Sequence, residues 1–164
     1  MMMIRRHTIS ILVNNQPGVL QRVSGLFGRR GFNIESITVG ESEETGLSRM
    51  VIVTQGDDKN LEQISKQLYK LIDVIKVVDL SSNPMVSREL ALIKVNAEPT
   101  MRPEILSVIE TFRASVVDIG PASLIVQVVG DPEKIDAMVE LLTPYGIREL
   151  SRTGVTAMIR GSVR

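Results

Sequence analysis

The stretch His7-Thr-Ile-Ser-Ile-Leu-Val-Asn-Asn-Gln-Pro-Gly-Val-Leu20 joins a β-strand pattern to a helical pattern. Up to Val13 polar and apolar residues alternate, which is typical of a half-buried strand. Beyond the corner, apolar residues recur at helical spacing and form one stripe, namely Val19, Leu20, Val23, Leu26 and Phe27. The stretch therefore predicts a strand that leads directly into an amphipathic helix.

The corner between the two elements, Asn15–Leu20, has the composition of a helix start. Pro17 suits the first helical turn, where its missing N–H costs nothing. Gly18 leaves room for a ligand to approach N–H groups that lack a partner inside the helix. These groups and the helix dipole favour an anion, so the corner could receive a small carboxylate. An ordinary capped helix start explains the same residues equally well.

Composition narrows the class of protein. A length of 164 residues suits one ordinary domain or two small ones, and 19 basic residues balance 19 acidic ones. No strong field therefore indicates a nucleic acid or an acidic partner. The sequence has no secretory leader and no apolar run long enough to cross a bilayer. We expect a cytoplasmic protein, and the absence of cysteine excludes disulfides, thiolate catalysis and cysteine-ligated metals.

Few residues are suited to catalysis. The only histidine, His7, begins a strand near the chain end, where we expect a solvated side chain and not a general base. Neither a phosphate-binding Gly-x-x-x-x-Gly-Lys-Ser/Thr loop nor a Gly-x-Ser-x-Gly elbow is present. Glu41, Glu43 and Glu44 are expected in a solvated turn. We predict no catalytic residue and no metal site, and interpret the chain as a binding protein.

One plan of strand, helix, two strands, helix and strand occurs twice. The first copy is predicted as 7–14, 17–30, 33–40, 47–54, 58–71 and 74–80, and the second as 89–96, 103–114, 116–119, 124–129, 132–145 and 149–159. Gly31 is expected to end the first helix in the left-handed conformation, and Asp57 to cap the second. The polar break Ser81–Pro84 separates the predicted domains, residues 7–81 and 85–160.

The two copies align at two different offsets. Gly56–Leu61 matches Gly130–Ile135 at an offset of 74, whereas the first helices match at an offset of 86. The difference means that the first half carries 12 more residues between its helices. We place them in the hairpin around Glu41–Gly46, where the second half has only the tight turn Gly120–Ala122.

A βαββαβ order gives a four-stranded antiparallel sheet with both helices on one face. The predicted fold class is therefore α+β, with two ferredoxin-like βαββαβ sandwiches in tandem. This arrangement leaves the second sheet face open. In the second half both faces are apolar, since Leu90 and Leu92 oppose Ala91, Ile93 and Val95. An open apolar face favours packing against another subunit or domain, and we expect a homodimer.

Phe32–Ser36 opens the second strand, which we expect to lie near the start of the first helix. Asn15 and Asn33 could then both offer amides to a ligand that has a carboxylate and an ammonium group. Leu20 and Ile34 could enclose an aliphatic side chain. Alternatively, both asparagines only cap turns.

At these residues the sequence resembles the small, regulatory subunits of acetohydroxyacid synthase (acetolactate synthase), whose N-terminal half is an ACT domain. Six stretches carry the resemblance and together cover nearly the whole chain: Asn15–Leu20, Gly25–Phe27, Arg30–Ser36, Leu47–Met50, Lys66–Val74 and Arg88–Val95. A lone Pro-Gly after a strand is a weak signal of an ACT domain, but this ordered set is highly specific.

The resemblance implies a subunit without an active site, which binds and activates a large catalytic subunit. It also implies feedback inhibition by valine or a related branched-chain amino acid. In the family the effector lies between two ACT domains paired edge to edge, which corresponds here to Asn15, Gly18, Val19, Leu20, Asn33 and Ile34. Gln21 stands at a position where several members of the family have a smaller residue. The family reaction joins decarboxylated pyruvate to a second 2-oxo acid. Its thiamine diphosphate, magnesium and frequent FAD belong to the large subunit.

Two other functions compete with this interpretation. A free-standing ACT-type amino-acid sensor differs only in the partner that receives the signal. RNA-recognition modules share the βαββαβ order, but they stack bases on sheet aromatics, and this chain has three Phe, two Tyr and no Trp. Gly28–Gly31 imitates the loop of KH domains, yet the β-favouring Ile34–Val39 follows in place of a helix. We therefore expect no nucleic-acid binding.

Overall fold

The computed structural model describes residues 3–161, which fold into two compact units. The first unit consists of the chain up to Val86 together with the residues from Val155 onward, and the second consists of Ser87–Gly154. The expected domains, 7–81 and 85–160, differ from these units mainly at the C-terminal end. There the chain returns to the first unit.

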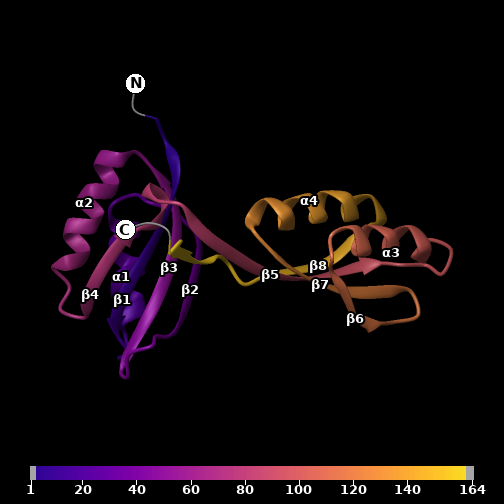
Figure 1. Cartoon of the computed structure of the whole chain (residues 1–164), viewed down its shortest axis with the longest axis horizontal. Coiled ribbons are helices and arrows are strands. Elements are labelled where there is room, and N and C mark those ends of the chain that lie inside the picture. Colours follow the sequence, from indigo (N-terminus) through magenta and orange to yellow (C-terminus); the bar gives the residue numbers. More distant parts are fainter. Residues whose placement is uncertain (1–2, 162–164) are drawn as a thin grey trace. The chain divides into compact units, whose positions relative to one another are not determined.

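In the first unit the elements follow the predicted βαββαβ order (Figure 1). They are β1 (Arg5–Asn14), α1 (Val19–Arg29), β2 (Ile34–Glu41), β3 (Leu47–Gly56), α2 (Asp58–Tyr69), β4 (Val74–Asp79) and the short 3-10 helix η1 (Leu80–Ser82). The four strands form an antiparallel sheet in the order β2-β3-β1-β4. This confirms the predicted fold of the first half.

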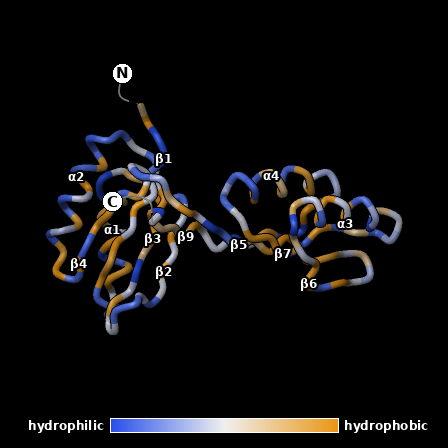
Figure 2. The backbone as a smooth tube through the Cα atoms, viewed as in Figure 1, coloured by the Kyte–Doolittle hydropathy of each residue, from blue (hydrophilic) through white to orange (hydrophobic). Residues whose placement is uncertain are grey.

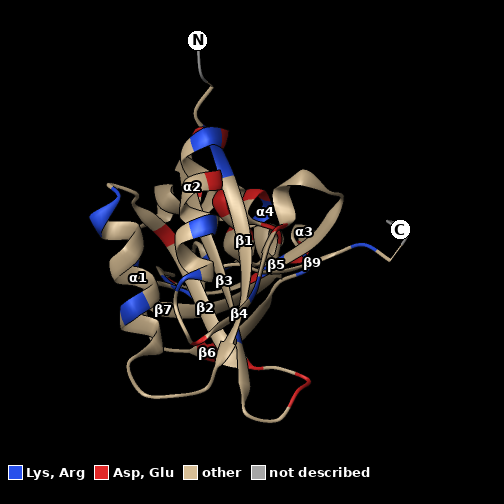
Figure 3. Ribbon diagram, turned by 90° about the vertical axis from the view of Figure 1, so that its left-hand side faces the viewer, with Lys and Arg blue, Asp and Glu red and all other residues tan. Residues whose placement is uncertain are grey.

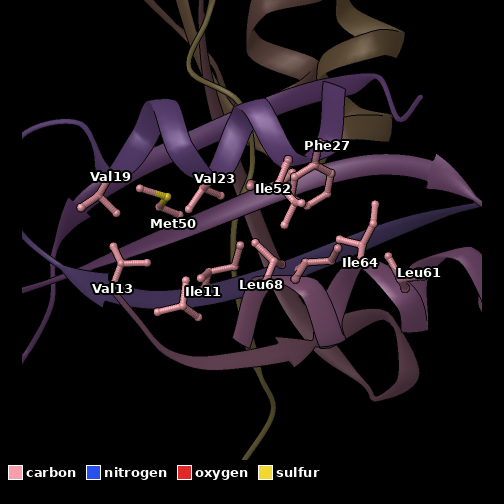
Figure 4. Close-up of a cluster of buried hydrophobic side chains, with 13 residues drawn as sticks. Ile11, Val13, Val19, Val23, Phe27, Met50, Ile52, Leu61, Ile64 and Leu68 are labelled. Carbon is pink, nitrogen blue, oxygen red and sulfur yellow. The ribbon is translucent and has the colours of Figure 1, made fainter. Parts of the chain in front are cut away.

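Both helices pack on one face of this sheet, where alternate strand residues form the core. The core includes Ile9 and the residues labelled in Figure 4, namely Ile11, Val13, Met50 and Ile52 of the sheet and Val19, Val23, Phe27, Leu61, Ile64 and Leu68 of the helices. The helix boundaries have the expected causes. The Asp57 side chain accepts a hydrogen bond from the Asn60 N–H at 2.7 Å, and Gly31 takes a φ of +75° after α1.

The opposite face of the first sheet is covered by the chain's own C-terminal strand, β9 (Thr156–Ile159). Val155 and Ala157 pack against Val51 and Val53 of β3 and against Leu80. The Thr38 hydroxyl donates to the Val155 carbonyl at 3.2 Å. The expectation that this face is open is therefore wrong for the first unit. The homodimer stays a prediction, but in the first half an open sheet face no longer supports it.

The second unit repeats the plan and has its own core. It contains most of β5 (Met85–Asn96), followed by α3 (Arg102–Thr111), β6 (Ser115–Ile119), β7 (Ser123–Gly130), α4 (Pro132–Leu142), the 3-10 helix η2 (Thr143–Tyr145) and β8 (Ile147–Arg152). The strand order is β6-β7-β5-β8, and hydrophobic residues line β5 and β7 (Figure 2). The strand predicted over 149–159 is divided, because β8 ends at Arg152 and β9 begins at Thr156.

An ion-pair network holds β8 in the second unit. The Arg152 guanidinium donates to both carboxylate oxygens of Glu89, at 2.7 and 2.9 Å, and to Asp136 at 2.7 Å. These hydrogen bonds, Glu89 first, raise the pKa of Arg152. Glu89 itself is buried. On the sheet face away from the helices, Leu92 and Val129 are 40% and 46% exposed, so the predicted apolar outer face is present here.

The two hairpins differ in length as predicted. Gly120–Ala122 forms a tight turn between β6 and β7, whereas Ser42–Gly46 forms a longer loop between β2 and β3. The longer loop has its own hydrogen bonds, including two at 3.0 Å from the Arg49 guanidinium to the Glu43 carboxylate. A backbone hydrogen bond at Glu43 and the contact with Arg49 hold the pKa of Glu43 below its ordinary value. The loop is therefore an ordered extension of the hairpin.

Candidate functional site

The corner between β1 and α1 forms an uncapped helix start. The helix begins at Val19, and Gly18 precedes it with a φ of +84° and no side-chain capping hydrogen bond. Pro17 therefore lies outside the helix and not in its first turn. Within residues 3–161, the N–H groups of Leu20 and Gln21 have no hydrogen-bond acceptor. These N–H groups and the positive end of the helix dipole favour an anion at this position.

A cation lies beside the same corner. Arg22 forms an ion pair with Asp73 (2.5 Å), and its Nη1 lies 2.9 Å from the position that a Cβ on Gly18 would occupy. The first turn of α1 contains no acidic residue, and Figure 3 shows basic residues along α1. Sequence reasoning missed this pair. Arg22 follows Gly18 at helical spacing, but Asp73 is 51 residues further along the chain and has no local signal.

The predicted effector residues near the corner differ in accessibility. Asn15, Gly18 and Leu20 are exposed, and Leu20 retains 46% of its surface. Val19 is only 3% exposed and belongs to the core between helix and sheet (Figure 4). Its side chain therefore cannot line a surface site. The Asn15 N–H donates to the Gly46 carbonyl at 2.9 Å, which connects the corner to the β2–β3 loop.

Asn33 and Ile34 lie at the other end of the first sheet. Ile34 pairs with Thr54, which pairs with His7 at the start of β1, whereas α1 begins beyond Asn14. The seven residue steps from His7 to Asn14 correspond to about 23 Å along an extended strand. The expectation that the start of the second strand lies near the start of the first helix is therefore wrong within one chain. The corner and the Asn33–Ile34 segment could meet only across two copies.

His7 is fully buried, contrary to the expectation of a solvated side chain. Its Nε2 lies 3.5 Å from an Asp58 carboxylate oxygen, and its Nδ1 lies 3.5 Å from an Asp79 oxygen. Both ring nitrogens lack a hydrogen bond of acceptable geometry. His7 is far from the corner, because it pairs with Thr54 at the opposite end of β1. Its position is structural, between the start of α2 and the end of β4.

Other kinds of site are not apparent in the described part of the chain. Among residues 3–161, no group of three or more His, Asp or Glu side chains is arranged to hold a metal ion. None of the helices described has the length and apolar character needed to span a membrane. A cavity lies at the start of β1, lined by Met3, Arg5 and Asp57–Lys59. The corner at the start of α1 is separate from it.

Comparison with protein families matches both halves of the chain. Residues 9–76 match the ACT domain typical of the small subunit of acetohydroxyacid synthase (AHAS), and residues 88–161 match the small subunit of acetolactate synthase. A probable acetolactate synthase small subunit of Methanothermobacter thermautotrophicus is 60% identical over 157 residues, which are 95% of this chain and 94% of the relative. The acetolactate synthase small subunit of Bacillus subtilis is 52% identical over 96% of this chain and 92% of its own length.

A solved structure is similar along almost the whole chain. The crystal structure of the small subunit of acetolactate synthase from Thermotoga maritima is 48% identical, with a TM-score of 0.87. The match covers 95% of this chain and 98% of the crystallised one. The similarity therefore extends over both units.

Proposed function

Since the chain belongs to the family of acetolactate synthase small subunits, we propose that it activates a catalytic large subunit and makes that subunit sensitive to valine or a related branched-chain amino acid. The chain is a regulatory small subunit of acetolactate synthase with an ACT domain. The large subunit would hold thiamine diphosphate, magnesium and any FAD, and this chain would contribute none of the three.

The main observation that supports an effector site here is the open helix start at Gly18. Two unpaired N–H groups at the start of α1 suit the carboxylate of an amino acid, and the Arg22 guanidinium, paired with Asp73, lies beside them. The side-chain carbonyl oxygen of Asn15 can accept a hydrogen bond from the ammonium group. The exposed Leu20 offers an apolar contact to an aliphatic side chain. One chain thus supplies only part of a site for valine.

A homodimer through β2 would complete this site. β2 is an edge strand and runs in the same direction as β1, because both are antiparallel to β3. If two copies pair β2 with β2 about a twofold axis, each β2 lies antiparallel to the other. The start of the partner subunit's β2 then lies beside the end of this β2, at the same end of the sheet as the corner. The separated halves, Asn15–Leu20 and Asn33–Ile34, would meet across the dimer interface.

Complementation between two inactive variants tests this composite site. Asn15→Ala and Asn33→Ala should each weaken valine binding in a calorimetric titration, with leucine and isoleucine titrated for comparison. In a mixed dimer one of the two sites carries both substitutions and the other carries neither. Statistical mixing should then restore tight binding at about a quarter of the sites. A mixture that binds no better than its two components would contradict the proposal that each site needs both subunits.

A further inference from the structure

Tyr69, the last residue of α2, binds the outer edge of β4. Its hydroxyl oxygen accepts a hydrogen bond from the Val77 N–H at 2.9 Å, and the same hydroxyl donates to the Val77 carbonyl at 3.2 Å. One side chain thereby satisfies both backbone polar groups of a residue in the middle of this strand. An unpaired strand edge is a template for pairing with another chain, and these hydrogen bonds remove part of that template.

Two further features of β4 weaken this edge for strand pairing without closing it. At its start, the Val74 N–H donates to the Leu71 carbonyl at 3.1 Å. The pairing of β4 with β1 changes register between Leu12 and Val13, and such irregularities are a known means of protecting sheet edges. Among the residues of β4, and within the described part of the chain, only Val77 has both backbone groups bound by a side chain.

The other edge of the first sheet is open. Within residues 3–161, no side chain forms a hydrogen bond to the backbone of β2 (Ile34–Glu41). Among the hydrogen bonds of the described residues, the second unit has no counterpart of the Tyr69 contact either. At the offset of 74 that aligns the second helices, Tyr69 corresponds to Thr143, whose hydroxyl donates to the Val139 carbonyl of its own helix at 2.7 Å. The contact is thus particular to the β4 edge.

We propose that Tyr69 closes the β4 edge of the first sheet against strand pairing, so that a second copy of this chain pairs with this sheet only at β2. The proposal rests on the homodimer of the proposed function and adds the residue that selects its edge. A sheet with one open edge can form only a closed pair. A sheet with two open edges can also pair β2 of one copy with β4 of the next, and such head-to-tail contacts continue without closing. Tyr69 would therefore keep the assembly finite.

The test is the substitution Tyr69→Phe in the full-length protein, with Tyr145→Phe as the matched control. Tyr145 also loses one hydroxyl in the control, but its partner is the Glu104 side chain in the second unit, at 3.1 Å, and no strand edge is involved. At low protein concentration, amide exchange at Val77 should become up to about tenfold faster in Tyr69→Phe, because one hydrogen bond is lost. At high concentration, light scattering should detect species larger than the wild-type assembly only in this variant.

A second substitution identifies the edge. Ile75 of β4 is 49% exposed, and a lysine at an edge opposes strand pairing. Tyr69→Phe combined with Ile75→Lys should return to the wild-type mass. Circular dichroism checks that every variant remains folded. A Tyr69→Phe variant with wild-type mass at all concentrations would overturn the proposal even if Val77 exchanges faster. An equal increase of assembly mass in the Tyr145→Phe control would also overturn it. Both outcomes are read from the mass relative to wild type, so they do not bear on the effector site, which is tested by valine binding.

Discussion

Placing a negative charge at the corner, by Gly18→Asp, should weaken effector inhibition and leave the fold intact. The added carboxylate would lie beside the N–H groups that we assign to the effector's carboxylate. Gly18 has a φ of +84°, so any side chain there is strained by about 1 kcal/mol. Aspartate tolerates this conformation better than most residues. The strain is small against the free energy of unfolding of an ordinary domain, about 5–15 kcal/mol.

The electrostatic cost at this position can be bounded. Two unit charges 4 Å apart repel by about 1 kcal/mol in water and by about 4 kcal/mol at an effective dielectric constant of 20. Gly18 is exposed, and the neighbouring Arg22 guanidinium would neutralise part of the new charge. We therefore expect a loss of about 1–3 kcal/mol, which corresponds to valine binding weakened about 5- to 150-fold.

The assay measures the valine concentration that half-inhibits the enzyme reconstituted from the variant and the large subunit. Gly18→Asn is the matched control, because asparagine has the same shape and the same backbone strain but no charge. The asparagine variant should stay much closer to wild type than the aspartate variant. If valine inhibits the aspartate enzyme at the wild-type concentration, the carboxylate does not bind at this corner. If both variants lose inhibition equally, steric exclusion and not charge is responsible.

Three further substitutions test other parts of the structure. Replacing Glu41–Gly46 with an Asn-Gly turn removes the Gly46 carbonyl, which accepts a hydrogen bond from the Asn15 N–H. The shortened hairpin should weaken dimerisation or activation without unfolding the domain. Unchanged sedimentation and activation would contradict this. In urea denaturation, Val155→Ala should lower the free energy of unfolding by about 1.5 kcal/mol, because two buried methyl groups are lost. In the control Met158→Ala, where the replaced side chain is exposed, this free energy should change by less than about 0.5 kcal/mol. Arg152→Met should cost about 2 kcal/mol by leaving Glu89 buried without its cation, and adding Glu89→Gln should recover part of the loss.

Local patterns predicted the strands and helices well, because each was encoded by its own residues. The alternation before Val13 and the helical stripe from Val19 both report the face that packs into the core, and both elements were found within a few residues of their expected bounds. The Asp57 cap is equally local, since acceptor and donor are three residues apart. The hairpin difference could be read from the two repeat offsets alone.

Features that depend on distant contacts were not predicted. One local signal was also missed, because the run 149–159 contains the polar stretch Ser151–Gly154, and the structure divides it there into β8 and β9, with Gly154 at a φ of +88°. His7 is buried beside Asp58 and Asp79, which are remote in sequence. The predicted position of Asn33 was wrong because the direction of β2 was not taken into account. A β2 that runs parallel to β1 must begin at the sheet end opposite the start of α1, and this could have been deduced from the predicted topology.

Reconstitution with the catalytic subunit tests the central claim most directly. The purified chain would be assayed for acetolactate production from pyruvate, with thiamine diphosphate and magnesium supplied, first alone and then with the large subunit of the same organism. We expect no product from the chain alone, a higher turnover of the large subunit when the chain is added, and a decrease of that turnover by valine. Turnover of pyruvate by the chain alone, or a large subunit whose turnover it leaves unchanged, would contradict the account.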